Sequence, residues 1–381
     1  MGYNRLMQYN WQQPDWPNFQ YELSAIYDIL FSIAEKMGRI SGKLSHLTEN
    51  LQTEAIINLM VEEAVNTSEI EGEHISRLDV RSSIKNKLGL NPTIARVHDK
   101  RAEGVAALML DVRNTFKQPI TENMLFNWHS MLLSDSSHRN LKIGGWRTDE
   151  EPMQIISGRH GKWIVHFEAP LSRDVPKEMK KFIHWFNNTA LGKPQAIKFV
   201  PVRAAIAHLY FESIHPFEDG NGRIGRAIAE KALSQGFGYP VMLSLSKTIE
   251  AERKAYYAAL HTASMSNEVT AWVHYFVNVV LCAQIDVEEQ INFILTKSVF
   301  FDIFKDLLND RQLKVVKRMM QAGVKGFAGG MSAKKYMTIT DTSKATATRD
   351  LQHLVAIHAV KQIGSGRSVR YELNLDGQVK K

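Results

Sequence analysis

Residues 215–226 of the chain read HPFEDGNGRIGR, and almost every side-chain type that a phosphate-transferring site needs lies in this run. It combines a histidine that can accept a proton, a carboxylate that can hold a metal ion, two glycines around an asparagine, and two arginines three residues apart. In chain order these are His215, Asp219, Gly220, Asn221, Gly222, Arg223 and Arg226. Glycines let backbone N–H groups face an anion, and arginines bind phosphates bidentately. The run therefore predicts an enzyme that acts on a nucleotide.

The same run contains the dinucleotide-binding pattern G-x-G-x-x-G at residues 220–225, but its surroundings argue against that interpretation. A Rossmann fingerprint requires a buried β-strand directly before the glycines. Here residues 201–214 carry apolar side chains at helical spacing, and residues 222–236 also have a helical pattern. The expected local structure is a helix–loop–helix. A Gly-rich corner with a chance histidine is the structural alternative, but it leaves the carboxylate and the two arginines unexplained.

A helix–loop–helix of this kind can hold the phosphates of one ligand. Backbone N–H groups converge at the N-terminus of the helix that begins near Gly222. Arg223 and Arg226 are neighbours on that helix because they are three residues apart. Asp219 suits Mg²⁺, which binds one or two carboxylates together with substrate phosphates. His215, at the end of the preceding helix, is placed to deprotonate an incoming hydroxyl group.

The run resembles the Fic-family signature H-P-F-x-[DE]-G-N-G-R-x-x-R and matches it at every defined position. Members of this family are helical, and most transfer AMP from ATP to a protein hydroxyl group. The resemblance implies that His215 is the general base and that Asp219 binds Mg²⁺. It implies that Arg223 contacts the phosphate chain and Arg226 the γ-phosphate, with the α- and β-phosphates at Gly220, Asn221 and Gly222. The nucleotide-binding run as a whole is Gly220, Asn221, Gly222, Arg223, Ile224, Gly225 and Arg226.

A second match lies at residues 67–72, TSEIEG, which resemble the family's inhibitory motif [ST]-x-x-x-E-[GN]. Thr67, Glu71 and Gly72 occupy its defined positions. The resemblance implies that Glu71 reaches into the nucleotide site and pairs with Arg226, the arginine expected to hold the γ-phosphate. It also implies the class of Fic proteins whose inhibitory helix lies N-terminal in the same chain. The structural alternative is a helix end capped by Gly72.

Two further segments resemble parts of the family's substrate site. Residues 152–170 contain two β-prone runs around Gly158-Arg159-His160-Gly161 and are expected to form a hairpin. This hairpin resembles the flap that pairs with an extended target segment, although a purely structural hairpin is the alternative. Residues 249–264 are expected to form a helix that resembles the one lining the adenine side. One of Tyr256 and Tyr257, with Tyr257 preferred, is expected to contact the nucleotide there, and a core tyrosine is the alternative.

The expected fold class is mainly α: a Fic-type helical bundle with a β-hairpin flap, an N-terminal helical extension and a C-terminal winged-helix domain. The expected domains are residues 1–95, 96–290 and 300–381. The winged helix is expected from a helix over residues 342–355 followed by a hairpin with its tip at residues 364–367. Residues 301–381 carry 15 Lys and Arg against 7 Asp and Glu, a net charge of +8, while the first 300 residues carry 32 against 33. This charge predicts DNA binding, with protein docking or dimerisation as alternatives.

Composition places the chain among ordinary globular proteins, with 44% hydrophobic and 23% charged residues. The single cysteine, Cys282, is expected to be a buried small hydrophobe. The N-terminal residues have no apolar segment of signal-peptide type, and no uninterrupted apolar run approaches the length of a membrane helix. A cytoplasmic protein without a membrane partner is therefore expected.

The resemblance leads to one main functional hypothesis and two alternatives. The main hypothesis is an autoinhibited protein adenylyltransferase that uses ATP and Mg²⁺ to modify a Ser, Thr or Tyr hydroxyl of another protein or of itself. The first alternative is a DNA-binding regulator in which the nucleotide site acts as a sensor. The second is the reverse enzyme, which removes AMP and in which Glu71 orients a water molecule. A homodimer is a further expectation.

Overall fold

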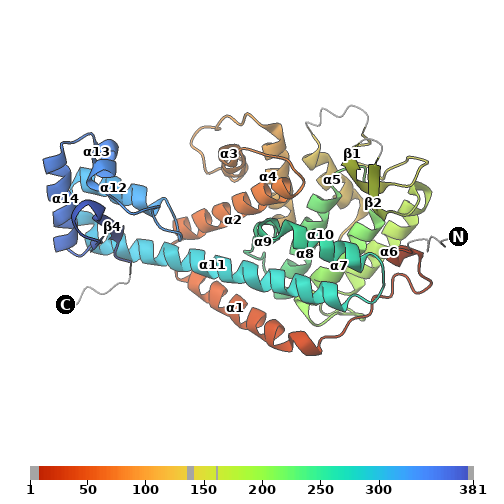
Figure 1. The fold of residues 1–381 in the computed structure, drawn as a ribbon. Helices are drawn as coiled ribbons and strands as arrows, with labels where there is room; N and C mark the ends of the chain where they lie inside the picture. The colour runs from red at the N-terminus through yellow and green to blue at the C-terminus, as the bar shows by residue number, and fades with distance from the viewer. Residues whose placement is uncertain (1–7, 135–140, 160–161, 376–381) are drawn as a thin grey trace. The chain divides into compact units, whose positions relative to one another are not determined.

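The computed structural model describes residues 8–134, 141–159 and 162–375. These residues form helices joined by loops, together with two β-hairpins (Figure 1). The chain divides into two compact units, the first from Met1–Gly38 and Ile56–Ile285, and the second from Arg39–Ala55 and Asp286–Lys381. Three long helices contribute residues to both units: α1 (Tyr27–Ser45), α2 (Glu49–Ile70) and α11 (Thr270–Phe304).

The first unit is built around α7 (Val200–Ile214), the helix that leads into the candidate site. Every residue of α7 is buried, as expected of a helix in the middle of a domain. Pro201 lies in its first turn, where the missing N–H group costs nothing. α8 (Asn221–Phe237) packs along α7 more closely than any other helix does (Figure 1). The remaining helices of this unit are α3 (Arg77–Lys87), α4 (Lys100–Asn114), α5 (Glu122–Leu132), α6 (Val175–Asn188), α9 (Leu245–Ala251) and α10 (Arg253–Ala263).

Several helices differ from their sequence-based expectations. α3 was not expected, because its eleven residues offer only a short apolar stripe; Ser76 caps it, and Val80 and Ile84 are buried. The single helix expected over residues 249–264 is broken at Glu252 into α9 and α10. Cys282 is exposed, so its expected burial is wrong: α11 has an outer face, and Cys282 lies on it.

The long C-terminal helix has the composition of a candidate membrane span. Within Thr270–Leu307, one 18-residue window is long and apolar enough to cross a membrane by length and composition, and half of that window is buried inside the protein. Core helices of large domains pass the same test. Trp272, which donates its indole N–H to the Ala205 carbonyl at 2.8 Å, shows that α11 packs into the core beside α7.

The expected hairpin consists of β1 (Gln154–Arg159) and β2 (Lys162–Glu168), which pair antiparallel with an irregularity between Ile155 and Ile156. Its tip, residues 160–161, lies outside the described residues. The N-terminal arm packs on the base of this hairpin. Tyr9 contacts the ring of Phe167 edge to face at 5.0 Å, and Trp11 donates to the Glu168 carbonyl at 2.8 Å. The arm therefore anchors the hairpin.

The second unit contains α12 (Asp310–Met320), α13 (Ala333–Thr340), α14 (Lys344–Ala356) and an antiparallel hairpin of β3 (Val360–Ile363) and β4 (Arg370–Leu373). This is the element order from which the winged helix was expected, and the winged-helix assignment itself stays a prediction. Asp350 is buried and accepts from Arg311 of α12 at 2.8 Å and from the hydroxyl of Tyr336 of α13 at 3.0 Å. One carboxylate thus joins the three helices.

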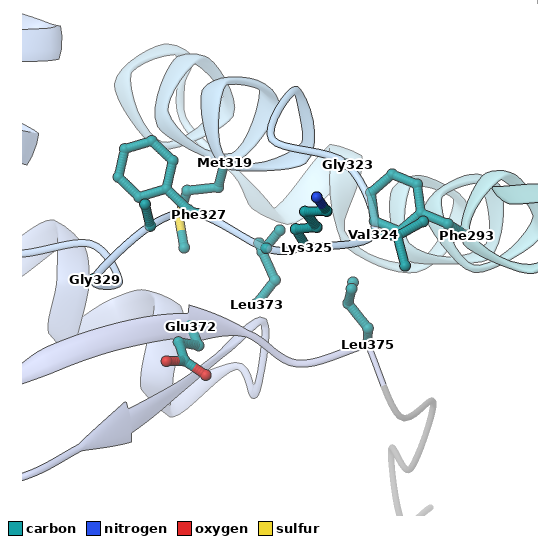
Figure 2. A pocket seen from close by; sticks show the side chains of 12 residues that line it. Phe293, Met319, Gly323, Val324, Lys325, Phe327, Gly329, Glu372, Leu373 and Leu375 are labelled. Carbon is teal, nitrogen blue, oxygen red and sulfur yellow. The ribbon is translucent and has the colours of Figure 1, made fainter. Parts of the chain in front are cut away.

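The second unit also holds a cavity of about 320 Å³ between the loop after α12 and strand β4 (Figure 2). Its apolar lining includes Phe293, Met319, Phe327 and Leu373, and Lys325 and Glu372 are its charged lining residues.

Candidate active site

The loop between α7 and α8 has the helix–loop–helix geometry that the sequence predicts. His215 ends α7 in the left-handed conformation, with φ 51° and ψ 61°, which costs a non-glycine residue about 1–2 kcal/mol. Gly220 begins α8 with φ 80°, where glycine carries no such cost. The amide of Asn221 accepts from the Phe217 N–H at 2.9 Å and donates to the Phe217 carbonyl at 2.8 Å. The Asn221 side chain therefore holds the loop, and only its backbone N–H can face phosphates.

Two residues of the predicted nucleotide-binding run face the core. Ile224 is fully buried. A side chain at Gly225 would place its Cβ 2.3 Å from Oε1 of Glu212 and 3.0 Å from Nδ1 of His208. These positions let α8 approach α7 closely and leave ligand contact to the other side of α8.

Arg147, which was not identified from the sequence, supports the loop between α7 and α8 through hydrogen bonds. Its Nε donates to the carbonyl of His215 at 2.8 Å, and its backbone N–H donates to the carbonyl of Pro216 at 3.0 Å. The same guanidinium donates to Ser172 at 2.8 Å and to the carbonyl of Pro170. Burial lowers the pKa of Arg147 to about 10, so the side chain stays charged at neutral pH. The buried guanidinium of Arg147 thus links Pro170 and Ser172, which follow the hairpin, to the backbone of His215.

His129 supports the other end of the loop and was also missed. Its Nδ1 accepts from the Gly144 N–H at 3.0 Å, which leaves Nε2 to donate to the carbonyl of Asp219 at 3.2 Å. The ring stacks on Phe217, with centroids 4.1 Å apart and planes 8° apart. Burial lowers the pKa of His129 to about 4, so the ring is neutral at physiological pH.

The two arginines of the run are both paired with carboxylates from the end of α2. Nη2 of Arg226 donates to Oε1 of Glu71 at 2.7 Å and to the carbonyl of Thr67 at 2.9 Å, and its Nε donates to the Thr67 hydroxyl at 2.8 Å. Burial works to lower the pKa of Arg226, but the charge and hydrogen bond of Glu71, together with Tyr256 and Glu212, outweigh it, so the pKa lies above its ordinary value. The structure brings together Thr67, Glu71 and Arg226 as the sequence predicts.

Glu71 also lies directly against the first turn of α8. A Cβ at Gly222 would be 2.1 Å from Oε1 of Glu71, a distance that real Cβ atoms do not show. The carboxylate therefore occupies the space over the helix N-terminus, where an anion is favoured. Gly72 has φ 81° and turns the chain at the end of α2. The capping of α2 by Gly72 and the contact of Glu71 with α8 are therefore compatible, and both occur.

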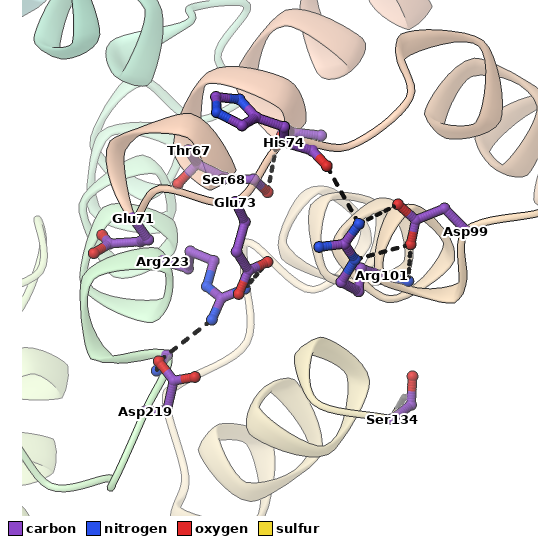
Figure 3. A network of polar contacts seen from close by, with 12 residues as sticks. Thr67, Ser68, Glu71, Glu73, His74, Asp99, Arg101, Ser134, Asp219 and Arg223 are labelled. Carbon is purple, nitrogen blue, oxygen red and sulfur yellow. Dashed lines mark hydrogen bonds and ion pairs between the residues drawn. The ribbon is translucent and has the colours of Figure 1, made fainter. Parts of the chain in front are cut away.

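Arg223 has a partner that the sequence did not reveal. Its Nη1 donates to Oε2 of Glu73 at 2.9 Å, and its Nη2 lies 3.5 Å from Oδ1 of Asp219 (Figure 3). The Arg223 side chain is only 3% exposed. Glu73 lies two residues after Glu71 in the chain. Its closeness to the motif at residues 67–72 is the signal that could have identified Glu73 from the sequence.

Asp219 fits a magnesium ligand of the kind that works with substrate phosphates. Its Oδ1 accepts from the Gly220 N–H at 2.6 Å, and its side chain remains 43% exposed. Within the described residues no group of three or more His, Cys, Asp or Glu side chains could hold a metal ion by itself. Mg²⁺ commonly takes one carboxylate, water and phosphate oxygens, so Asp219 suits an ion that arrives with the nucleotide.

A cavity of about 490 Å³ lies between the hairpin, α7 and α10. Tyr257 lines it, whereas Tyr256 is buried in the core, where its hydroxyl contacts Nε2 of His208 at 2.8 Å. Tyr257 also donates to the carbonyl of Ile70 at 3.2 Å, so the same residue reaches the end of α2. Other lining residues are Ile155, Ile156, His166, Phe167, Leu209, Glu212, Ser213, Arg253, Leu260, His261 and Ser264.

Two family models match the chain: "Fic/DOC family" over residues 119–233, and "Domain of unknown function (DUF4172)" over residues 9–90. Among curated proteins, the chain is 25% identical over 248 residues to protein adenylyltransferase fic-1 of Caenorhabditis elegans, covering 63% of this chain and 44% of that protein. It is 37% identical over 199 residues to protein adenylyltransferase Fic of Aedes aegypti, covering 51% and 35%. The chain thus matches less than half the length of these two relatives.

Solved structures show the same fold. A Fic family protein from Desulfovibrio desulfuricans superposes with a TM-score of 0.54 at 19% identity, covering 94% of this chain and 98% of that chain. A Fic domain containing signaling protein from Bacteroides thetaiotaomicron gives a TM-score of 0.51 at 20% identity, covering 70% and 96%. The predicted mainly α, Fic-type fold is therefore confirmed. Residues 119–233, which hold the hairpin, α7 and the loop between α7 and α8, match the Fic/DOC family model within this mainly helical chain.

Proposed function

We propose that this protein is a protein adenylyltransferase that Glu71 holds inactive at rest. It would transfer AMP from ATP to a Ser, Thr or Tyr hydroxyl of another protein or of this chain itself, and release pyrophosphate. The observation that carries the proposal is the loop of α7 and α8. This segment brings together His215 in a strained backbone conformation, the N-terminus of α8, and the buried Arg223 and Arg226. The partly exposed carboxylate of Asp219 lies beside them. The names of the relatives support the same reaction class.

In this proposal each group has one task. His215 takes the proton of the target hydroxyl as its oxygen bonds to the α-phosphorus, and the bond from that phosphorus to the pyrophosphate oxygen breaks. The N–H groups at the start of α8, with Arg223 and Arg226, bind the phosphate oxygens and stabilise the charge on pyrophosphate. Mg²⁺, held by Asp219 and the phosphates, would neutralise further charge.

The cavity beside α10 supports a binding place for the rest of the nucleotide and for the target. Its apolar wall and Tyr257 suit a purine base, as in most small-molecule sites. In the part of the chain that the structure describes, no third strand pairs with β1 or β2, so the edges of the hairpin can accept an extended target segment by strand addition.

Inhibition follows from the contacts of Glu71. Its carboxylate occupies the anion position over Gly222 and takes a donor of Arg226. A γ-phosphate would need both this anion position and that donor of Arg226. ATP would therefore bind weakly or in a pose unsuited to in-line attack. Removing the Glu71 side chain should therefore activate the protein.

The test uses purified protein with ATP labelled at the α-phosphate and Mg²⁺. We expect the Glu71→Gly variant to label itself or a lysate protein strongly, the wild type weakly, and the Glu71→Gly/His215→Ala variant not at all. No labelling by Glu71→Gly would contradict the proposal, and labelling that survives His215→Ala would refute the role of the histidine. Release of AMP from the labelled product by the wild type alone would favour the reverse enzyme.

A second function, DNA binding by residues 301–381, is supported by their net charge of +8 and by exposed Lys344 and Arg349 on α14. Lys297, Lys305 and Lys317 additionally line an open groove of about 360 Å³ on α11 and α12. We expect full-length protein to bind duplex DNA with an affinity that falls steeply with salt. Binding that is absent at 50 mM salt would leave protein docking or dimerisation as the role of this region.

A further inference from the structure

Glu212 and His215 face each other one turn apart on α7. Oε2 of Glu212 lies 3.7 Å from Nδ1 of His215, within the range of an ion pair and beyond that of a hydrogen bond. Among the described residues, neither Nδ1 of His215 nor Oε1 of Glu212 has a hydrogen-bond partner. The Glu212 side chain is only 7% exposed. A carboxylate this deeply buried costs several kcal/mol unless a charge compensates it.

The surroundings of Glu212 keep it ionised and direct its charge toward His215. Burial alone would raise the pKa of the Glu212 carboxyl, but His215, His208 and Arg226 together hold that pKa below its ordinary value. Burial lowers the pKa of His208 while the Glu212 charge works to raise it, and Nε2 of His208 contacts the Tyr256 hydroxyl on its other side. Arg226 is already bonded to Glu71 and Thr67.

We propose that Glu212 is a positioning residue for His215. This inference rests on the proposed transfer reaction. With its proton at Nδ1, toward Glu212, His215 presents the lone pair of Nε2 to the target hydroxyl. When Nε2 takes the hydroxyl proton and the oxygen bonds to the α-phosphorus, the ring becomes an imidazolium ion. The carboxylate of Glu212 then stabilises that ion, and apo contacts of this kind tighten in the reacting complex. Gly225 is required because any side chain there would displace Oε1 of Glu212.

The test compares Glu212→Gln and Glu212→Asp in the Glu71→Gly background. We expect Glu212→Gln to lower kcat by at least about tenfold while KM for ATP changes by less than about twofold, because the charge acts only after proton transfer. Glu212→Asp should recover part of kcat. An unchanged kcat, or a loss in kcat that follows loss of folded protein in thermal unfolding, would overturn the proposal.

A second readout does not need the reaction. Nitrogen-15 NMR of the labelled histidine rings reports which nitrogen of His215 carries the proton. We expect the Nδ1–H tautomer in the wild type and a mixture in Glu212→Leu, with His215→Asn identifying the signal. An Nε2–H tautomer in the wild type would overturn the proposal even if the protein is an adenylyltransferase. The expected tautomer without any labelling would instead point to failure of the proposed function alone.

Glu73 carries a separate inference through its ion pair with Arg223. The turn at Gly72 brings the Glu73 N–H to the Ser68 carbonyl at 2.9 Å and the Glu73 carboxylate to Arg223 at 2.9 Å (Figure 3). Arg101 of α4 donates to the carbonyl of His74 at 3.3 Å and so holds the segment that follows. With Glu71 on Arg226, both phosphate-binding arginines of the loop are occupied by carboxylates.

We infer that Glu73 is a second inhibitory residue, which blocks Arg223 independently of Glu71. This also rests on the proposed function, but its test measures binding of ATP rather than transfer. Glu71→Gly frees only Arg226, so we expect Glu71→Gly/Glu73→Gln to bind ATP with Mg²⁺ about five- to tenfold more tightly than Glu71→Gly, as expected for release of a buried arginine.

Glu69→Gln in the same background is the matched control, since it removes an equal charge from the same helix end. The contact of Glu69 with Arg253 is made by its backbone carbonyl, so this substitution leaves that contact in place. ATP binding that Glu73→Gln leaves unchanged or weakens, or that Glu69→Gln improves as much, would overturn the inference. If no variant binds ATP, both this inference and the proposed function fail. Binding by Glu71→Gly without transfer would remove the proposed function alone.

Discussion

The guanidinium of Arg226 donates both to the side chain of Glu71, at 2.7 Å, and to the side chain of Thr67, at 2.8 Å, so one buried cation ties the end of α2 to α8. The hydroxyl of Thr67 is therefore part of the same contact as the carboxylate of Glu71.

Replacing Thr67 should weaken this contact without touching Glu71. Thr67→Val keeps the shape but removes the acceptor for Nε of Arg226, which leaves a buried donor unpaired at a cost of about 1–3 kcal/mol. We expect lower stability in urea unfolding and higher basal labelling than in the wild type. Thr67→Ser, which keeps the hydroxyl, is the control and should stay close to the wild type in both measurements.

A methyl group at Gly222 should interact with Glu71. Gly222→Ala places a Cβ 2.1 Å from Oε1 of Glu71, so we expect a loss of about 1–3 kcal/mol in the wild type. In the Glu71→Gly background the clash is gone, and alanine should be neutral or should stabilise the helix by up to about 1 kcal/mol. Urea unfolding of the four proteins gives the coupling energy. Equal effects in both backgrounds would show that Glu71 does not lie over Gly222.

Arg147 should be essential to the loop although it is remote from the nucleotide run in sequence. Arg147→Lys keeps the charge but cannot reach the carbonyls of His215 and Pro170 together with Ser172. We expect a loss of about 2–4 kcal/mol in unfolding free energy and at least about a tenfold loss of labelling rate in the Glu71→Gly background. Arg173→Lys, at an exposed site close by, is the control and should change neither quantity.

Stability should also depend on pH through Glu230 of α8. Burial raises the pKa of Glu230 to about 8, with nearby Glu63 acting in the same direction. In the unfolded chain this carboxyl ionises near 4.5. Between these values the folded state binds the extra proton, so stability falls as pH rises from about 4.5 to about 8. Glutamine imitates the protonated form. We expect Glu230→Gln to match the wild type at pH 5 and to exceed it by about 2–4 kcal/mol at pH 8 in urea unfolding. A constant difference would contradict this.

The sequence was informative wherever the determining contacts are local or belong to a compact motif. Helical spacing over residues 201–214 predicted α7 to within one residue of its observed start, and the β-prone runs predicted the hairpin. The pairing of Glu71 with Arg226 was predicted from two short motifs, each with defined positions.

The missed features depend on contacts that no local pattern carries. Arg147 and His129 reach the loop across 68 and 90 residues of chain, and neither lies in a recognisable motif. The family resemblance implies that Asn221 helps to hold phosphates, and what the sequence did not reveal is that its amide bonds to the backbone of Phe217 and closes the turn. α3 was missed because it has few apolar residues, and its packing on α4 is a tertiary contact that propensity alone does not reveal.

In the proposed function Glu71 is attached to the chain that it inhibits, so it would behave as a tethered competitor of ATP. Its effective concentration at the anion position is set by the short, capped end of α2 and does not change when the protein is diluted. Under this proposal ATP would have to outcompete a fixed internal concentration of carboxylate. Any event that loosens the last turn of α2, even by a fraction of a turn, would lower that concentration and raise activity in proportion. The residues of the loop between α7 and α8 would not have to change.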